Sequence, residues 1–477
     1  MFLTVGSIIF PLITFPYASR VLGPTGTGSV AFVTSVTSYF TLFSQLGIPI
    51  YGVRECSKVR DDKAKLSNVV QELLVISAIA TCISCCLLAT CVVFVPQFRA
   101  YSELFFVLSS SVILGSLGME WLFKGLEEYA YISLRSLLFK ILALLALFVF
   151  VHTVNDVLVY AFTTVIASVG SNICNFIRVR KIIDFKLRNK LEIKRHLKPI
   201  FLLFAMTAVT TVYTSLNSTL LGLLTSTDEV GFYDVAVKVR ALSVSLVTSL
   251  SVVMLPRASF YLGKGDHESF LELSKKSSRY NFVFASAIAT FILVFAKPII
   301  LVIAGEEYYP AIAISRVLAC AIIMVALSNV TGTQVLVPLG GERGALLAAV
   351  AGAAASLILD LFLIPFLGGL GAAISTLVSE IIVLLVQVLF LNLTGNLSFF
   401  KLPIARVLFA SALAGLLSSI VLLLGFASIV EIIIGFTAFS SIYIVVLLLL
   451  REPTTVNVVQ VIYEKLRMIC EKAYRNG

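Results

Sequence analysis

Three charged residues stand close together within one long apolar stretch, residues 231–255: Asp234, Lys238 and Arg240. If this stretch is a helix, a rise of about 1.5 Å per residue places the two cations roughly 10 to 14 Å below its outer end. Charges at that depth in hydrocarbon are costly and normally face a bundle interior or water. Asp234 lies four residues before Lys238, so these side chains share a helical face and can form a structural ion pair. Arg240 has no obvious local acid, which makes it the first candidate for binding an anion.

Further cations lie in or beside other apolar stretches. Arg20, Arg54 and Arg316 are candidates for the lining of a cavity. Each also has a simpler explanation. Arg20 fits an anchor at the membrane interface, Arg54 fits an ordinary cytoplasmic charge, and Arg316 fits a side chain that snorkels or pairs.

Acids inside apolar stretches suggest ion coupling. Asp360 and Glu380 lie deep enough that protonation or cation binding would change their cost substantially. Together with Asp234, they are our candidates for coupling H⁺ or Na⁺ movement to another process. Each acid has the alternative of pairing with a lysine or arginine across the bundle.

Histidine and cysteine positions argue against an enzyme or a metal site. His152, His196 and His267 all fall in predicted connections, so no cluster of histidine with carboxylates lies within the apolar stretches. The cysteines of segment 82–91 have no second pair or nearby histidine, and small apolar packing explains them. The sequence also has no P-loop lysine motif. We therefore predict no catalytic residues, no metal and no cofactor.

The elements that carry these residues are predicted from hydropathy. Apolar stretches fill the chain to residue 450, and each is long enough for the roughly 20 residues that a spanning helix needs. Hydrophobic residues make up 59% of the 477 residues and charged residues 13%, well below the ~25% charge usual in soluble domains. The sequence therefore predicts an all-α polytopic membrane protein of about fourteen transmembrane helices, because backbone polar groups in lipid are satisfied within helices. The predicted spans are residues 2–22, 29–52, 69–95, 104–123, 131–151, 156–177, 199–224, 231–255, 280–304, 311–336, 345–366, 370–393, 403–426 and 431–450.

Basic residues set the predicted orientation. The net charge of +10 is concentrated in the connections after even-numbered spans and in the C-terminal segment, whereas the odd-numbered connections carry only Arg99. By the positive-inside rule, the even connections and both termini face the cytoplasm. The basic connections are short, juxtamembrane and mixed with acids, which disfavours nucleic-acid binding. No signal peptide is predicted. Because Met1 already lies in apolar sequence, we expect that the start is clipped or misassigned.

Two halves of the chain have similar spacing. The first pair of spans in each half ends in a basic connection, after Arg54 and after Arg257, and the turn at residues 23–28 has a counterpart at 225–231. Six spans is an even number, so the halves are parallel repeats related by a pseudo-twofold axis along the membrane normal, and such transporters place substrate between the repeats. We predict two six-helix bundles at residues 1–198 and 199–394, two further helices within 395–450, and a basic cytoplasmic tail at 451–477.

The most distinctive local sequence lies in the first span and its turn. Two prolines bend the span and a Gly/Pro turn follows it. The motif residues are Pro11, Leu12, Ile13, Thr14, Phe15, Pro16, Tyr17, Ser19, Arg20, Val21, Leu22, Gly23, Pro24, Gly26, Gly28 and Phe32, supported by Leu255, Pro256 and Arg257 and by Gly371, Ala372, Ala373, Thr376, Ser379 and Glu380. In these residues, and over essentially its whole length, the chain resembles the polysaccharide repeat-unit flippases. These exporters of O-antigen and capsule units belong to the multidrug/oligosaccharidyl-lipid/polysaccharide exporter superfamily.

The resemblance implies transport of undecaprenyl-pyrophosphate-linked oligosaccharide across a bacterial cytoplasmic (inner) membrane by alternating access. It implies a cationic lumen for the pyrophosphate, and the similar lipid II flippases have cavity arginines around the positions of Arg20 and Arg54. The implied partners are the lipid-linked oligosaccharide, membrane lipids, H⁺ or Na⁺, and polysaccharide polymerase and export machinery. The candidates for substrate contact are then Arg240, Lys238, Arg20, Arg54 and Arg316.

Two other functions fit parts of the sequence. A drug or cation exporter of the same superfamily would share the helix plan, but it would favour a carboxylate-rich pocket, whereas residues 231–255 are net cationic. A membrane-embedded enzyme that acts on lipid-linked sugars would usually need a sizeable external loop with catalytic groups, and the predicted external connections are short. The sequence therefore favours a carrier, and not an enzyme.

Overall fold

The described part of the chain is entirely helical in its regular elements, as predicted. In this computed structural model, the described residues are 2–185, 191–393, 402–460 and 464. The rest of the predicted basic tail, the start of the segment predicted at 395–450, and part of the basic connection near residue 188 lie outside the described residues.

Helix length and composition identify a multi-pass membrane protein. Within the described residues, ten helices are long and apolar enough to cross a membrane, and a bent pair, Thr227–Ser249 with Met254–Gly263, adds an eleventh if it counts as one span. Each of these helices can cross hydrocarbon because a helix satisfies its backbone polar groups internally. The predicted fold class is confirmed at this level.

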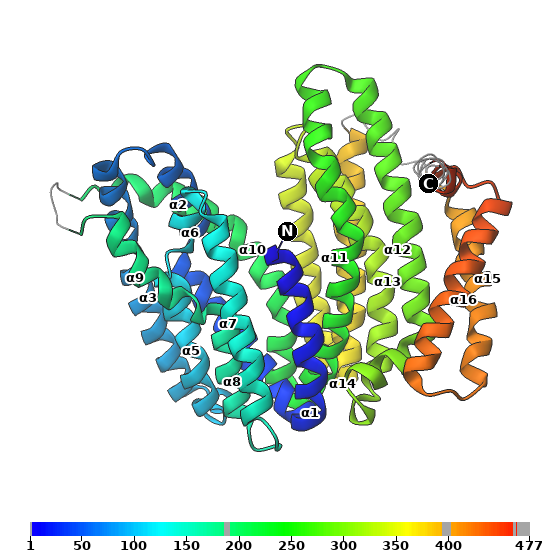
Figure 1. The fold of residues 1–477 in the computed structure, drawn as a ribbon, viewed down its shortest axis with the longest axis horizontal. Coiled ribbons are helices and arrows are strands. Elements are labelled where there is room, and N and C mark those ends of the chain that lie inside the picture. The colour runs from blue at the N-terminus through cyan, green and yellow to red at the C-terminus, as the bar shows by residue number, and fades with distance from the viewer. Residues whose placement is uncertain (1, 186–190, 394–401, 461–463, 465–477) are drawn as a thin grey trace, which may run out of the picture. The chain divides into compact units, whose positions relative to one another are not determined.

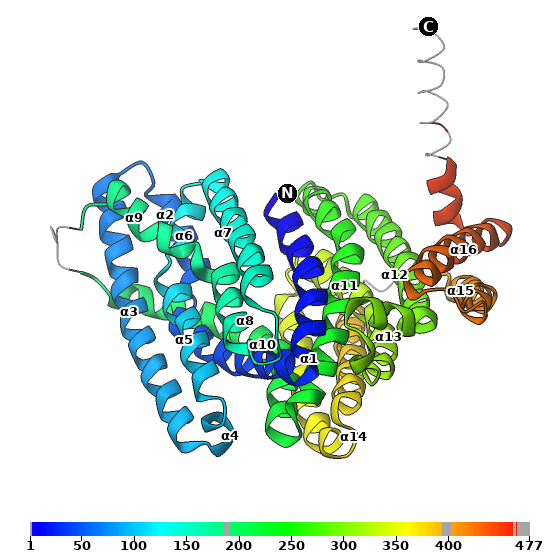
Figure 2. The same ribbon diagram turned by 60° about the horizontal axis from the view of Figure 1, so that its bottom comes forward.

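The chain folds into two units, and unit 1 contains Met1–Asp234, Ile303–Glu307 and Leu357–Ala372. Its complete elements are α1 Phe2–Gln45, α2 Ile48–Lys58, α3 Lys63–Phe94, α4 Pro96–Arg99, α5 Ser102–Leu117, α6 Glu120–Gly125, α7 Tyr129–Phe150, α8 Val157–Val165, the π-helical η1 Ile166–Gly170, α9 Asn172–Ile182 and α10 Lys194–Leu224. Figure 2 shows α3 and α5 alongside each other with the short α4 at their common end.

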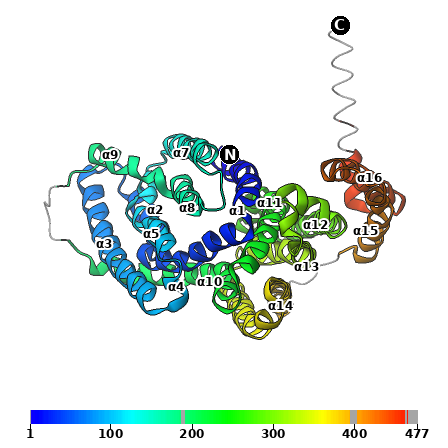
Figure 3. The same cartoon turned by 90° about the horizontal axis from the view of Figure 1, so that it is seen from below.

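Unit 2 contains Val235–Val302, Tyr308–Ser356 and Ala373–Gly477. Two long helices, α11 Thr227–Gly263 and α14 Glu342–Leu393, contribute to both units. Helices α15 and α16 run side by side (Figures 1 and 3). The remaining elements are α12 His267–Ile303, the short η2 Glu306–Tyr308, α13 Ala311–Asn329, the π-helical η3 Val330–Leu336, α15 Ile404–Ser418, η5 Ser419–Leu423 and α16 Ser428–Leu449.

Two of the longest helices are broken where the sequence predicts connections. Helix α1 has a non-helical residue at Gly23, with φ +66°, and α14 has one at Gly368, with φ +53°. Glycine adopts this left-handed region without the steric cost that a side chain brings. At the second break, the backbone N–H of Gly369 donates to Oε2 of Glu229 at 2.7 Å, which satisfies a group that the broken helix leaves open.

The end of the second predicted span differs from the prediction. Residues 29–52 were expected to form one helix, but α1 ends at Gln45 and a separate helix, α2, begins at Ile48. Leu46 lies between them with φ +49°, a strained conformation for a residue with a side chain. Gly47 permits close packing there, because a Cβ would overlap the carbonyl oxygen of Ile200.

The turns at residues 23–28 and 225–231, which occupy corresponding places in the two halves of the sequence, are in contact within unit 1. A Cβ on Gly28 would overlap the carbonyl oxygen of Thr227, and a Cβ on Gly231 would overlap that of Pro24. Oγ1 of Thr25 also donates to the Asp228 carboxylate at 2.6 Å. Small residues allow such backbone contact between membrane helices.

A buried polar network joins α2, α3 and the start of α10. Oε2 of Glu72 lies 2.6 Å from Nη2 of Arg195 and 2.7 Å from Nε2 of His196. The other histidine nitrogen lies 2.8 Å from the hydroxyl of Tyr51. Glu72 and His196 are both 2% exposed, so the pairing offsets the cost of burying them.

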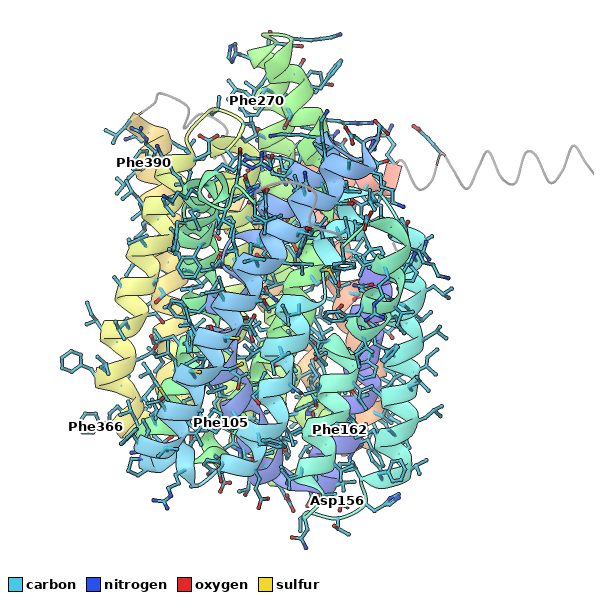
Figure 4. The ribbon with its side chains drawn as sticks, turned by 90° about the vertical axis from the view of Figure 1, so that its left-hand side faces the viewer. Phe105, Asp156, Phe162, Phe270, Phe366 and Phe390 are labelled. Atoms are coloured by element: carbon cyan, nitrogen blue, oxygen red, sulfur yellow. The ribbon has the colours of Figure 1, made fainter. Side chains whose placement is uncertain are left out.

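Connections predicted to be external lie at one end of unit 1. Figure 4 shows Phe105 near the start of α5, Asp156 just before α8, and Phe162 within α8, all toward the same end. Asp156 accepts hydrogen bonds from the backbone N–H groups of His152 and Thr153, and these bonds hold the pKa of its carboxyl below the usual range.

Sidedness is testable with single cysteines in a cysteine-free background. Thr227 is buried, so Ser226, which is exposed, is the better reporter of the predicted external turn. We expect a membrane-impermeant maleimide to label Ser226→Cys in intact cells, because the turn carries no basic residue. Lys58→Cys is the control and should label only after permeabilisation. The reverse pattern would overturn the orientation.

The contact between the two turns predicts a specific sensitivity to a methyl group. We expect Gly28→Ala to lower the unfolding free energy by about 2 kcal/mol, because the added Cβ forces the packed backbones apart. The measurement is the melting temperature of purified protein in detergent. Gly263→Ala is the matched control, since a Cβ there meets no atom within 4 Å. Equal melting temperatures for the two variants would contradict the close packing.

Candidate functional site

A cavity of about 470 Å³ lies within unit 1. It is walled by α1, the α1–α2 junction, α5, η1 and α10, and we name it the hydroxyl cavity. Among the described residues that line it, none carries a charge. Its polar lining residues are Thr34, Thr37, Ser38, Thr41, Gln45, Ser111, Ser168, Thr207 and Thr211, and the others are Leu42, Leu46, Gly47, Pro49, Ile50, Leu108, Gly115 and Val169.

The hydroxyl protons of several lining residues are already committed to their own helices. Thr37 donates to the carbonyl of Val33 at 2.7 Å, and Thr41 donates to that of Thr37 at 3.0 Å. Ser111 donates to the carbonyl of its helix at Leu108 in the same way, at 2.6 Å. A hydroxyl oxygen has two lone pairs in addition to its proton. Thr37 is buried, at 2% exposed, whereas Thr41 and Ser111 are partly exposed and present hydrogen-bond acceptors to the cavity.

Other lining residues keep their donors available. Within the described residues, the side chains of Thr34, Gln45 and Thr211 make no hydrogen bond. The amide of Gln45 brings two N–H donors and one carbonyl acceptor. The cavity thus combines fixed acceptors with a few free donors.

Local backbone irregularities shape two of the walls. Ser168 and Val169 lie in the π-helical turn η1, a widened form that is frequent at functional sites. The α1–α2 junction, with Leu46 at positive φ, forms another wall. Both features place the cavity where helices are interrupted.

Unit 2 brings together two of the predicted site residues. Nη1 of Arg240 on α11 lies 3.6 Å from Oε1 of Glu380 on α14. Their side chains are 21% and 9% exposed, so the pair is largely shielded from water. Arg240 therefore has an acid partner that its local sequence does not show. This is a finding about pairing, and the predicted roles in substrate binding and ion coupling stay predictions.

Two further charged residues of α11, Asp234 and Lys238, lie where the chain passes from unit 1 to unit 2. Lys238 and Asp234 are half-buried, and Asp234 lies close enough to Tyr160 of α8 to interact electrostatically. Asp234 belongs to unit 1 and Lys238 to unit 2, so their pairing stays a prediction. Asp360 on α14 is fully buried in unit 1.

The remaining candidate cations lie at exposed positions. Arg20 is exposed, and the aliphatic part of its side chain lies beside Gly305. Nε of Arg316 donates to the carbonyl oxygen of Leu293 at 3.2 Å, close to a kink of α12 at Phe295. Neither residue lines the hydroxyl cavity.

Arg54 lies in an exposed charge cluster on α2. Its side chain is 56% exposed, and Nε lies 3.2 Å from Oε1 of Glu55. Partial burial opposes ionisation of Glu55, but hydrogen bonds from Lys58 and Arg54 hold the pKa of that carboxyl below its usual range. The Arg54 guanidinium also lies over the ring of Tyr51, 5.3 Å from its centroid. These contacts suit a surface ion pair.

Comparison with protein families decides the classification. Residues 1–261, more than half of the chain, match the family described as polysaccharide biosynthesis protein. The chain belongs to this family.

Curated relatives of this family member are named as candidate O-antigen transporters. One from Escherichia coli (strain K12) is 23% identical over 389 residues, which are 80% of this chain and 93% of that protein. One from Shigella dysenteriae is 26% identical over 385 residues, which are 79% of this chain and 94% of that protein.

Solved structures show that this polysaccharide biosynthesis family member has a known transporter fold. The lipid II flippase MurJ in an inward closed conformation superposes with a TM-score of 0.73 at 15% identity, covering 94% of this chain and 98% of that chain. An inward-facing multidrug resistance MATE family transporter of the MOP superfamily superposes with a TM-score of 0.63 at 16% identity, covering 81% and 95%. At these identities the likeness establishes the fold.

Sequence reasoning missed the hydroxyl cavity. Its residues are uncharged and common in membrane helices, so nothing about residue type singles them out. Spacing is the signal that was available: Thr34, Thr37, Thr41 and Gln45 recur at intervals of three and four residues, which places them on one helical face.

The Arg240–Glu380 pair of unit 2 predicts that the effects of the two side chains on the unfolding free energy are coupled. We expect Arg240→Gln or Glu380→Gln alone to lower the unfolding free energy by about 2 kcal/mol, because each leaves a shielded charge without this partner. The double variant should lose less than the sum of the two single losses. The measurement is thermal unfolding in detergent.

The exposed pair of Arg54 and Glu55 supplies the control for this cycle. Arg54→Gln and Glu55→Gln should each change stability by less than about 1 kcal/mol and should combine additively, because solvent screens the pair. Additive losses at 240 and 380 would show that the two side chains are not coupled.

Proposed function

We propose that this protein is a flippase that moves undecaprenyl-pyrophosphate-linked oligosaccharide repeat units from the cytoplasmic to the periplasmic leaflet by alternating access, coupled to H⁺ or Na⁺. The membership of the polysaccharide biosynthesis family supports the class of cargo. The named O-antigen transporters among its relatives support the repeat unit as substrate. The fold shared with a lipid II flippase supports a lipid-linked molecule.

The observation that carries this proposal is the hydroxyl cavity inside a membrane-spanning unit. A cavity that opens among lipid-embedded helices and presents hydroxyl oxygens and an amide suits a polar, hydroxyl-bearing cargo. Its described lining has no carboxylate, so it does not suit an organic cation. The cavity therefore favours a sugar over a cationic drug.

The proposal includes the full helix plan. Helix α1 is not among the eleven candidates. If α14 counts as two spans divided at Gly368, and α1 adds two more divided at Gly23, the total reaches the fourteen spans of the predicted plan. We propose that these form two parallel six-helix lobes at residues 1–198 and 199–394, followed by two helices within 395–450, with both termini in the cytoplasm of a bacterium. The polymerase and export machinery stay proposed partners.

We propose separate tasks for the charged residues. Arg240 and Lys238 meet the pyrophosphate as it leaves the headgroup region, and a guanidinium offers two parallel donors to phosphate oxygens. Arg20, Arg54 and Arg316 serve earlier or later contacts at exposed positions. The pair of Arg240 with Glu380 supports a coupling role, because cargo phosphate and the glutamate would compete for one guanidinium.

The proposal is tested with purified protein in liposomes that contain a fluorescent undecaprenyl-pyrophosphate-linked oligosaccharide. We expect the protein to move the probe between leaflets, measured as the fraction protected from a reductant added outside. Protein-free liposomes are the control. Lectin binding and a mass measurement show whether the probe is intact and inserted in the liposomes. If it is, but the protected fraction equals that of protein-free liposomes, the flippase proposal is wrong.

Replacing both Arg240 and Glu380 with glutamine tests, in the same assay, whether Arg240 contacts the cargo or only neutralises Glu380. The double variant Arg240→Gln with Glu380→Gln removes both charges of this pair, so we expect it to fold while its flipping rate falls about tenfold or more. Arg240→Lys should keep part of the rate, because charge remains while the forked donor geometry is lost. A double variant with the full rate would show that Arg240 serves only to neutralise Glu380.

A further inference from the structure

We propose that the hydroxyl cavity binds uncharged sugar residues of the repeat unit and discriminates against sugars that carry a carboxylate. This inference rests on the proposed function and adds the chemical class of sugar that the protein accepts. It also assigns the sugar to unit 1, which contains every described lining residue of the cavity.

The hydrogen-bonding pattern of the cavity matches a neutral sugar. A sugar hydroxyl donates one hydrogen bond and accepts others. Thr41 and Ser111 offer lone pairs because their protons are held by carbonyls of α1 and α5. Gln45 and Thr211 keep free donors within the described part of the chain. The lining therefore offers both acceptors and donors for sugar hydroxyls.

The same pattern is unfavourable for a carboxylate. A carboxylate accepts hydrogen bonds and donates none, so it gains nothing from the lone pairs of Thr41 and Ser111. Burial of an ionised group without a paired charge is costly. The described lining supplies no Lys, Arg or His. A hexuronate would therefore enter only at a substantial loss of affinity.

The size and layout of the cavity suit part of a repeat unit. Its volume of about 470 Å³ lies within the roughly 300 to 1,000 Å³ of small-molecule sites. The polar stripe of α1 from Thr34 to Gln45 is roughly 16 Å long at 1.5 Å per residue. The stripe can therefore contact more than one sugar ring along its length.

The test compares two probe lipids that differ in one group. Both carry undecaprenyl pyrophosphate and a fluorescent disaccharide, and the second sugar is a neutral hexose in one probe and the corresponding hexuronate in the other. Equilibrium binding to the purified full-length protein in detergent is measured at pH 7. We expect the neutral probe to bind at least about tenfold more tightly, because the uronate is ionised and desolvated. Equal affinity for the two probes would overturn the inference.

Two variants tie the preference to the cavity. Gln45→Lys adds a cation to the lining and should raise the affinity of the hexuronate probe until the preference is lost or reversed. Gln97→Lys, at an exposed position on α4, is the control and should keep the tenfold preference. A preference that survives Gln45→Lys unchanged would locate the discrimination outside the hydroxyl cavity and overturn the assignment.

A third variant tests the acceptor pattern without any added charge. Thr41→Val removes a lining hydroxyl and should weaken binding of the neutral probe about threefold to tenfold. Thr90→Val is the matched control, because Thr90 makes the same bond to its own helix, to the carbonyl of Cys86 at 2.8 Å, outside the cavity. Equal losses in the two variants would count against the cavity as the sugar site.

Binding and transport are read separately, so the two proposals can fail separately. A protein that prefers the neutral probe in detergent but moves neither probe in liposomes supports the sugar site and overturns the flippase. A protein that moves both probes at one rate and binds them equally supports the flippase and overturns the neutral-sugar inference.

Discussion

In hydrocarbon, a polar group cannot hydrogen-bond to water and must find its partner within the protein. The rest of this structure follows from that constraint. The backbone meets it because every regular element of the described chain is a helix. Where a helix does break, a side chain replaces the missing partner, as Glu229 does for the N–H of Gly369. Many serine and threonine side chains, such as Thr37 and Thr41, meet the constraint by donating their protons to carbonyls one turn back.

The same constraint is stronger for charges, because burying an unpaired charge costs more free energy than burying an unpaired hydroxyl. Arg135 is 4% exposed and bonds to the side chains of Ser171 and Asn172, both at 2.9 Å. Glu72 is held by Arg195 and His196. These partners lie on different helices, so these two buried charges also join elements. The described residues that line the cavity of the same unit carry no charge.

The sequence predicts what depends on composition and local spacing. Hydropathy gives the helices, and the glycines at 23 and 368 mark breaks that fall inside predicted connections. Local spacing does not show contacts between distant segments. Arg240 lacks a local acid, and its partner Glu380 is 140 residues away in the chain, which only the folded structure reveals. The junction at Leu46 was missed for a related reason, because packing of Gly47 against the backbone of α10 decides it.

The hydroxyl cavity was missed because its uncharged residues do not stand out in hydropathy. An uncharged binding site nevertheless suits a carrier. A carrier must bind its cargo firmly enough to select it and weakly enough to release it on the other side, as conduction also requires. A neutral hydrogen bond contributes about 0.5–1.5 kcal/mol net, whereas bonds to charged groups contribute about 1.5–3. Several neutral contacts from Thr41, Gln45 and Thr211 can therefore sum to selectivity in small steps, each of which is lost at little cost as the cavity opens. A single buried ion pair with the sugar would concentrate the same affinity in one contact and would hold the cargo until that contact broke.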